Sequence, residues 1–448
     1  MNGKVLLFKF ALVAAVLSAT GCGSVTPQSL APTPDIAPTV IPTPTTAPST
    51  ETPLAVAFVK GGNIELWDSA TGQSQTFVNS GDIVSVWISD DGQVIAFTRR
   101  EWVGDILDGF EQLSLWAINR DGGNPRELVP AQDLRQRLTP DERESTNFFQ
   151  LDWIPQTHEL IFTGTKYIVQ AEGLSHAIPQ GAYVVNTDTG SITVLAESTE
   201  NLRLAPSSNC GQIALMSPSG LSFINKDGSN RRQNVLTYPA AGIIGPLFPT
   251  GAWSQDSRAF VVTASFERDP NMDVNFTFWR VPVDGSPAET LAAVTKSHPD
   301  SVTFSPDGRY ASFFKATDSR PTEIAGWFIT PFSVEVGPLA IPYYGKEAFY
   351  ANLHWSPAGE AFVINDHDLV QLCPDATQDS QVCGEPIHLG IDSNIITSLQ
   401  WVDGERFLIA GIEPNTLTLG QLDGTFTPIV TWADNDVPGW SMSTAPGR

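Results

Sequence analysis

The sequence predicts an all-β fold built from repeated four-stranded units, and three observations predict it. A motif of about fifty residues recurs along the chain, and its clearest copy is VTFSPDGRYASFF at 302–314. In each copy two short apolar strands flank a tight turn, and a second turn, such as Asp284 and Gly285, joins two further strands. No long stretch has the 3.6-residue period of an amphipathic helix. Four short strands per repeat indicate a β-propeller, which is a ring of four-stranded blades.

Each part of the motif has a physical reason. The first strand ends in an aromatic residue that is large enough to wedge between neighbouring sheets. In the Ser-Pro-Asp-Gly turn, proline restricts φ and glycine tolerates the positive φ that the return requires. The next strand is continuously apolar because sheets cover both of its faces. The anchoring aromatic residues are Trp87, Trp153, Trp253, Phe304, Trp355 and Trp401.

The two ends of the folded region, residues 54–444, predict how a single ring closes. The segment 54–77 contains a second, third and fourth strand with no aromatic strand before them. The segment 437–441, with Trp440, looks like a first strand with nothing after it, so it can complete the N-terminal blade. This count predicts eight blades. Seven is the alternative if a weak copy of the motif, such as the one at 204–216, is misread.

The N-terminal residues have the pattern of an export signal. In residues 1–21, Lys4 and Lys9 accompany an apolar run that is too short to span a bilayer. The small residues before Cys22 resemble a bacterial lipoprotein signal, in which the cysteine becomes lipidated; the alternative is an ordinary secretory signal cut near Ala19. Residues 22–53 are rich in Pro, Thr, Ser and Ala and predict a flexible tether. We therefore expect an exported protein held by lipid alone on the extracytoplasmic side of a bacterial cell membrane or at the cell surface.

The remaining cysteines predict one disulfide. Cys373 and Cys383 bracket a short loop and are expected to pair in an oxidising compartment. Cys210 has no second cysteine or histidine near it at zinc-ligand spacing, so a buried free thiol is expected there.

The loop lengths predict which side of the propeller binds a ligand. The turns between the first and second strands and between the third and fourth are tight, and they share one face, called here the plain face. The other connections are long and share the opposite face, called here the elaborated face, and binding residues concentrate on such loops. Half of their aromatic residues could instead cover the blades. The residues expected to bind are Trp102, Phe110, Tyr167, Tyr238, Phe266, Arg268, Arg320, Tyr343, Tyr344 and Tyr350.

Signals for catalysis and for cofactors are weak. The sequence has no Gly-x-Ser-x-Gly elbow, no glycine-rich phosphate loop and no His-Glu-x-x-His motif, so no catalytic residue is predicted. No cofactor and no metal are expected, although Asp434 and Asp436 leave calcium open and 366–368 reads as a solvated turn. The formal net charge of −24 argues against nucleic acid and against electrostatic binding to anionic lipid.

The aromatic-Ser-Pro-Asp-Gly-x-x-Ile-Ala-Phe pattern resembles the TolB-type, WD-like propeller repeat of exported bacterial proteins. The copies at 154–157 and 254–257 lack the final glycine. The repeat implies the fold and says little about activity. We expect a monomeric binding or scaffolding module for a protein, peptide or glycan at the cell envelope. The alternatives are a propeller lyase or hydrolase that uses acids in the central funnel, and a partner of an envelope transport complex. The tether occupies the place of the α/β domain that TolB carries before its propeller.

Overall fold

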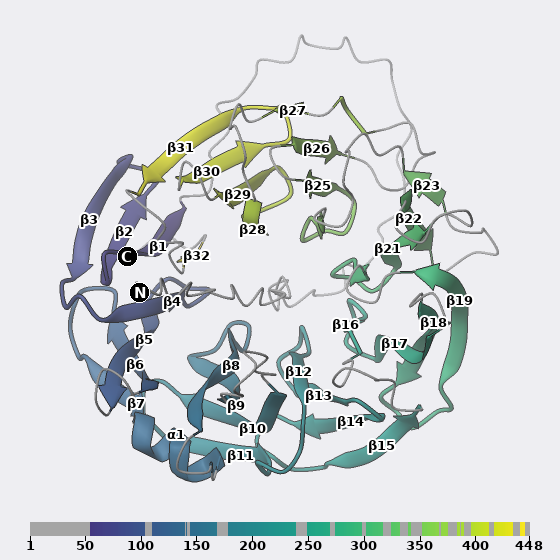
Figure 1. Ribbon diagram of the computed structural model, residues 1–448, viewed down its shortest axis with the longest axis horizontal. Coiled ribbons are helices and arrows are strands. Elements are labelled where there is room, and N and C mark those ends of the chain that lie inside the picture. The colour runs from purple at the N-terminus through teal and green to yellow at the C-terminus, as the bar shows by residue number, and fades with distance from the viewer. Residues whose placement is uncertain are drawn as a thin grey trace, which may run out of the picture.

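The computed structural model describes the part of the chain that was expected to form the propeller. The described residues are 54–103, 110–138, 140, 144–167, 178–238, 249–268, 274–297, 302–316, 324–331, 339–341, 352–366, 369–374, 383–385, 387–388, 396–411, 416–432 and 440–443. Their strands form antiparallel sheets that stand side by side around a ring (Figure 1). The fold is therefore a single β-propeller of four-stranded antiparallel blades, as predicted.

Six of the sheets among the described residues have four strands. Sheet 1 contains β1 (Ala55–Lys60), β2 (Asn63–Asp68), β3 (Gln73–Val78) and β32 (Trp440–Ser443); sheet 2 contains β4 (Ile83–Ile88), β5 (Val94–Val103), β6 (Phe110–Asn119) and β7 (Arg126–Val129). Sheet 3 contains β8 (Ser145–Trp153), β9 (Glu159–Tyr167), β10 (Ile178–Asn186) and β11 (Ile192–Ala196); sheet 4 contains β12 (Arg203–Pro206), β13 (Gln212–Ser217), β14 (Gly220–Asn225) and β15 (Arg232–Thr237). Sheet 6 contains β24 (Asn352–Trp355), β25 (Phe362–Asp366), β26 (Leu369–Cys373) and β27 (Ile387–His388); sheet 7 contains β28 (Ile396–Trp401), β29 (Arg406–Gly411), β30 (Thr416–Gln421) and β31 (Phe426–Thr431).

Sheet 5 has eight strands, and it changes the predicted blade count. It contains β16 (Gly251–Trp253), β17 (Ala259–Arg268), β18 (Val274–Pro282), β19 (Glu289–Ser297), β20 (Thr303–Phe304), β21 (Tyr310–Ala316), β22 (Ile324–Pro331) and β23 (Leu339–Ile341). The described strands thus form seven sheets, the alternative number, and not eight separate ones. The cause is the length of β19, which lets Ser297 pair with Lys315 of β21 and joins two strand groups. The weak motif near Ala205 does form a first strand, β12, so a misread copy is not the reason.

The ring closes through the last described strand. β32 pairs with β1 in antiparallel register from Ala55↔Ser443 to Phe58↔Trp440. Figure 1 shows the purple strands of the N-terminus and β32 together in one sheet. The Ser441 hydroxyl also accepts a hydrogen bond from the Ile88 N–H of sheet 2, at 3.0 Å. The prediction that the C-terminal strand completes the N-terminal blade is confirmed.

The hydrophobic core consists of layers between neighbouring sheets. Between sheets 2 and 3, for example, Val94 and Ala96 pack in one cluster with Leu160 and Phe162, and all four are buried. Apolar residues on both faces of the central strands are explained by this arrangement, because every sheet is covered on both sides. Two of the anchoring aromatics behave as predicted: the Trp253 indole donates to the Ala205 carbonyl and the Trp401 indole to the His354 carbonyl, both at 2.9 Å across a sheet boundary.

The tight turns of the plain face close through their own side chains. In the 305–310 turn, Ser305 Oγ donates to Asp307 Oδ1 at 2.7 Å, and the Tyr310 N–H donates back to Ser305 Oγ at 2.9 Å. Gly308 has φ of 67°, the left-handed value that glycine tolerates. Ser257 adopts φ of 55° at the equivalent place, so this turn forms without the glycine that its motif lacks.

Candidate ligand-binding face

The long hairpin of sheet 2 carries the best-placed predicted binding residue. β5 and β6 pair as far as Val103↔Phe110, whereas β4 pairs with β5 only up to Arg99. The last residues of the hairpin therefore project as a two-stranded ribbon on the elaborated face. Trp102 lies there with 53% of its surface exposed, and Phe110 begins the returning strand. Trp102 and Val194 are the two exposed large hydrophobic residues among the described part of the chain.

Charged pairs support the base of this hairpin. Arg100 Nε lies 2.9 Å from Glu111 Oε2, and Arg99 Nη2 lies 2.8 Å from Asp82 Oδ2. The Arg99 guanidinium also stacks over the Trp116 ring, 5.0 Å from its centroid. Since these groups are partly exposed, each ion pair contributes about 1 kcal/mol or less to the free energy of folding. They hold the ribbon in place and leave Trp102 open to solvent.

The other predicted binding residues are only partly within the described chain. Tyr167 ends β9, and Phe266 and Arg268 lie near the end of β17, so their backbone positions are at the far ends of long hairpins of sheets 3 and 5. These three residues therefore lie on the elaborated face, as Trp102 does in sheet 2. The residues that lie outside the described part are Arg320, Tyr343, Tyr344, Tyr350, Asp434 and Asp436.

Tyr238 was predicted on the binding face, but it is a buried structural residue. Only 8% of the surface of Tyr238 is exposed to solvent, and its hydroxyl donates a hydrogen bond to the Ser217 carbonyl at 2.9 Å. Burial raises the pKa of the Tyr238 phenol well above its ordinary value. The reason is local: β13 and β14 join by a short turn between Ser217 and Gly220, so no long hairpin projects from sheet 4 and Tyr238 folds over the turn.

A helix in the long connection between sheets 2 and 3 covers the boundary between them. α1 (Ala131–Leu138) lies within the segment 131–148 and buries Ala131, Leu134 and Leu138. A Cβ atom on Gly164 would lie 2.5 Å from Leu138 Cδ1, so the helix can approach β9 this closely only because residue 164 is glycine. Leucines four residues apart, with arginines in the last turn, were the available helix signal. With only eight residues, this pattern is too short to be distinguished from the strand repeats on either side of it.

The plain face has a shallow polar groove between sheets 4 and 5. Its volume is about 550 Å³, and its lining includes Asn209, Lys226, Asp256 and Arg258. Lys226 Nζ is already paired with Glu159 Oε2 at 2.7 Å, and the Arg258 side chain is 84% exposed. The groove has no aromatic platform, in contrast to the elaborated face around Trp102.

Titratable residues in the described part of the chain include two whose pKa is shifted by burial, but no metal-binding group. No group of three or more His, Cys, Asp and Glu residues among them could hold a metal ion. Burial raises the pKa of Asp152 in β8 and lowers the pKa of His354 in β24 to about 4. Asp152 belongs to sheet 3 and His354 to sheet 6.

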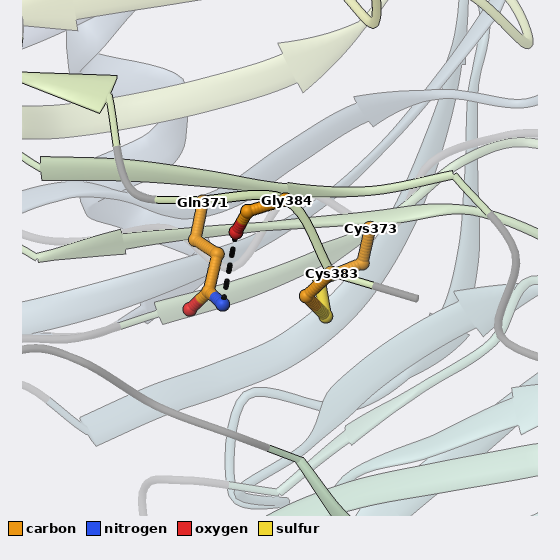
Figure 2. The surroundings of a disulfide bond; sticks show 4 residues. All are labelled: Gln371, Cys373, Cys383 and Gly384. Atoms are coloured by element: carbon orange, nitrogen blue, oxygen red, sulfur yellow. Dashed lines mark hydrogen bonds between the residues drawn. A yellow bond between two sulfur atoms is a disulfide. The ribbon is translucent and has the colours of Figure 1, made fainter. Parts of the chain in front are cut away.

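The predicted disulfide is present. Cys373 at the end of β26 and Cys383 are joined (Figure 2). Next to it, the Gly384 N–H donates to the Leu372 carbonyl at 2.9 Å, and Gln371 Nε2 donates to the Gly384 carbonyl at 3.4 Å. The bond therefore ties the segment that leads into β27 to the end of β26, within sheet 6.

Cys210 corrects a second expectation about cysteines. It is half-buried, in the turn between β12 and β13, and it is disulfide-bonded rather than a free thiol.

Within the described chain, no helix is both long and apolar enough to cross a membrane. The Cys373–Cys383 disulfide is compatible with an exported protein.

Comparisons with known proteins give structural neighbours only. No family model and no curated protein matches the sequence. Among solved structures, the chain is similar to the β-propeller domain of the Trilobed protease from Pyrococcus furiosus, at 12% identity and a TM-score of 0.44, over 78% of this chain and 97% of that one. A eukaryotic initiation factor matches at 12% identity and a TM-score of 0.49, over 87% and 98%. A putative 6-phosphogluconolactonase from Bacteroides fragilis matches at 12% identity and a TM-score of 0.36, over 77% and 97%. Identities this low assign no activity, substrate or partner.

Proposed function

We propose that this protein is an extracytoplasmic, lipid-anchored binding or scaffolding module that takes a protein, peptide or glycan on its elaborated face. The observation that carries the proposal is the difference between the two faces. The β5–β6 hairpin of sheet 2 runs on past β4 and β7, and the β17–β18 hairpin of sheet 5 runs on past β16, whereas tight turns close the other side. A rigid ring with projecting hairpins on one face is a common arrangement for binding.

The chemistry around Trp102 supports a macromolecular or glycan ligand. An exposed indole lies beside the Arg100–Glu111 pair, which combines an apolar surface with a cation and an anion. Tryptophan and arginine are enriched among the residues that contribute most to protein interfaces. The same ring can stack on the apolar face of a sugar.

The export route belongs to the same proposal. The small-residue run before Cys22 supports lipidation, residues 22–53 would lift the ring from the membrane, and the repeat supports a TolB-type relationship. The disulfide is compatible with an oxidising compartment.

We also propose that sheet 5 contains two repeats, β16–β19 and β20–β23, which would make eight repeats in the ring. One residue pair joins the two halves, and Phe278 and Val294 of the first pack on Phe313 of the second as residues do between separate sheets. An experimental structure of residues 54–448 tests this by the number of aromatic-anchored layers around the ring. Seven layers would contradict the proposal.

The binding face is tested by comparing the two exposed hydrophobic residues. Trp102→Ala removes the exposed ring on the elaborated face, and Val194→Ala is the matched control on β11 at the rim of sheet 3. The probes are a glycan array and a cross-linked extract of cell envelopes. We expect Trp102→Ala to weaken any reproducible ligand at least about five-fold, equivalent to about 1 kcal/mol, and Val194→Ala to leave it unchanged. Equal losses from both variants at matched stability would place the binding surface elsewhere.

The anchor is tested by the variant Cys22→Ser. We expect this variant in the soluble fraction, and a lipid mass on the N-terminal peptide of the unaltered protein only. A lipidated cysteine carries its lipid on sulfur and cannot form a disulfide. A disulfide-linked Cys22 peptide in protein isolated from cells, or membrane association that persists in the variant, would therefore contradict the anchor.

A further inference from the structure

His158 links two neighbouring sheets at the plain face. It lies in the turn between β8 and β9 of sheet 3, and its Nε2 is 3.1 Å from Asp91 Oδ2 in the β4–β5 turn of sheet 2. Its Nδ1 is 3.0 Å from Asp188 Oδ2, in the turn between β10 and β11 of sheet 3. Both ring nitrogens thus face carboxylate oxygens. Only the protonated imidazole can donate to both, because the neutral ring carries a single N–H.

The other charged groups around this boundary make protonation favourable. Asp90 of sheet 2 accepts a hydrogen bond from the Gln156 N–H at 2.8 Å, which adds a third carboxylate. Arg126 of β7 donates its Nε to the Thr187 carbonyl, and its Nη2 lies 3.7 Å from Asp188 Oδ1. Glu159, next to His158, is paired with Lys226 at 2.7 Å. The boundary therefore carries three carboxylates and one arginine around His158, and protonation of His158 reduces this excess of negative charge.

The corresponding turns show what is unusual about His158. The same backbone bond, from the first N–H of each turn to the carbonyl five positions later, gives six equivalent positions, which hold Gln93, His158, Gly211, Arg258, Arg309 and Glu360. Arg309 pairs with Asp307 of its own turn and donates to the Ala358 carbonyl of the next sheet at 3.5 Å. An arginine stays charged at all physiological pH values, whereas a histidine titrates within that range.

We infer that His158 is a pH-sensitive latch between sheets 2 and 3. In its protonated form it bridges Asp91 and Asp188 and tightens the plain-face end of this boundary; deprotonation releases one of the two contacts. In the extracytoplasmic location that we propose for this protein, the latch would meet changes of pH in the surrounding medium.

The direction of the pH dependence follows from the surroundings. Partial burial alone would lower the pKa of His158, but the hydrogen bonds and charges of Asp91 and Asp188 outweigh it, so the pKa is raised. Partial burial alone would raise the pKa of Asp91. The hydrogen bonds from Ser89 and the Gln93 N–H, together with His158, outweigh this effect and lower the pKa, so the carboxylate stays ionised. A group whose pKa is higher in the folded than in the unfolded chain stabilises fully below its unfolded pKa, about 6.5 for histidine. The stabilisation is lost as the pH rises through the folded pKa.

The first measurement is an NMR titration of the full chain with ¹³C-labelled histidine, with the His158 signal assigned by its absence in His158→Gln. We expect a pKa above about 6.5 that falls towards this value in the Asp91→Asn, Asp188→Asn double variant. A pKa at or below about 6.5 in the unaltered chain would overturn the inference, and beyond the assignment this result needs no variant.

The second measurement separates a latch from a merely structural contact. Hydrogen exchange is followed in the turns 89–93, 154–158 and 187–190 at about pH 5.5 and about pH 8.5, after correction for the intrinsic exchange rates. We expect stronger protection at the lower pH in the unaltered protein. The difference in protection between the two pH values should be lost in His158→Gln, because glutamine is neutral at both, as is Gln93 in the neighbouring turn. It should also be lost in His158→Arg, because arginine is charged at both pH values. The same pH difference in His158→Gln as in the unaltered protein would sink the proposal.

Discussion

The interactions that close the ring in sheet 1 differ from those that hold sheets 2 and 3 together. In sheet 1 the two ends of the folded chain meet by backbone pairing, and the residues of β1 from Ala55 to Phe58 are almost completely buried. Between sheets 2 and 3 no strand crosses. An apolar layer around Phe162 fills the interior, and polar groups join the plain-face end, where the His158 side chain is 31% exposed.

The difference separates what holds the ring together from what can adjust it. Backbone pairing and apolar burial operate away from water and contribute several kcal/mol per element. A partly exposed ion pair contributes about 1 kcal/mol or less, and salt screens it. Changes in the ion pairs are therefore expected to alter the stability of the boundary between sheets 2 and 3 without opening the ring. The predictions below test this order of strengths.

The largest effect is expected when the closing strand is removed. A chain that ends after Asp436 loses β32, which leaves β1 with an unpaired edge and exposes the apolar residues beneath it. We expect the free energy of unfolding to fall by more than about 5 kcal/mol, a large part of the stability of an ordinary domain, with aggregation. Thermal unfolding and light scattering measure both. A chain that ends after Ser443 is the control, and an unchanged melting temperature in the shorter chain would show that ring closure does not depend on β32.

A smaller but still large effect is expected inside the boundary between sheets 2 and 3. Phe162 is fully buried and stacks on Tyr183, with ring centroids 5.1 Å apart. Phe162→Ala should lower the free energy of unfolding by about 3–5 kcal/mol because it leaves a cavity. Denaturant titration measures this loss beside that of His158→Gln at the same boundary. If His158→Gln cost as much as Phe162→Ala, the proposed division between apolar layer and polar latch would be wrong.

The disulfide adds a covalent link to the comparison. Ten positions separate Cys373 from Cys383, and closing so short a loop should stabilise the fold by about 3 kcal/mol at most. Cys373→Ser with Cys383→Ser should therefore fall between the apolar and polar effects in chemical denaturation. Mass spectrometry of unreduced peptides checks that the bond forms in cells. Two free thiols in protein isolated from the envelope would contradict it.

The smallest of these effects concerns single indole hydrogen bonds. Trp253→Phe keeps a buried ring but removes the donor to the Ala205 carbonyl, so we expect a loss of about 1–2 kcal/mol. Trp153→Phe is the matched control, because Trp153 Nε1 has no hydrogen-bond partner within the described structure. Equal losses in the two variants, measured by thermal unfolding, would show that only the packing of the ring matters.

The fold was largely predictable because its signals are local and repeated. The turns with Gly92, Gly308 and Gly359 all have positive φ, as the motif requires, and the closing strand followed from what was missing at each end. Two strand groups are joined into sheet 5 because β19 extends as far as Ser297, and no residue type in the sequence predicts where a strand ends. The preferred count of eight separate sheets was therefore wrong, and the seven sheets match the alternative count.

The site was predictable only in outline. Exposure depends on what a neighbouring connection does: Trp102 is open because its hairpin is long, and Tyr238 is buried because the hairpin beside it is short. His158 gave no signal in the sequence, since Asp91 and Asp188 approach it only through the folding of two sheets.

The pairing of β1 with β32 also has a consequence for the order of folding. The paired residues Phe58 and Trp440 are separated by nearly the whole folded chain, and the loop-closure entropy of such a contact can be offset only when the intervening sheets are already compact. The central sheets can form as their residues emerge, but sheet 1 must wait with three strands. Until residues 440–443 arrive, the nascent protein carries an open strand edge, and this interval is when it most needs protection from other chains.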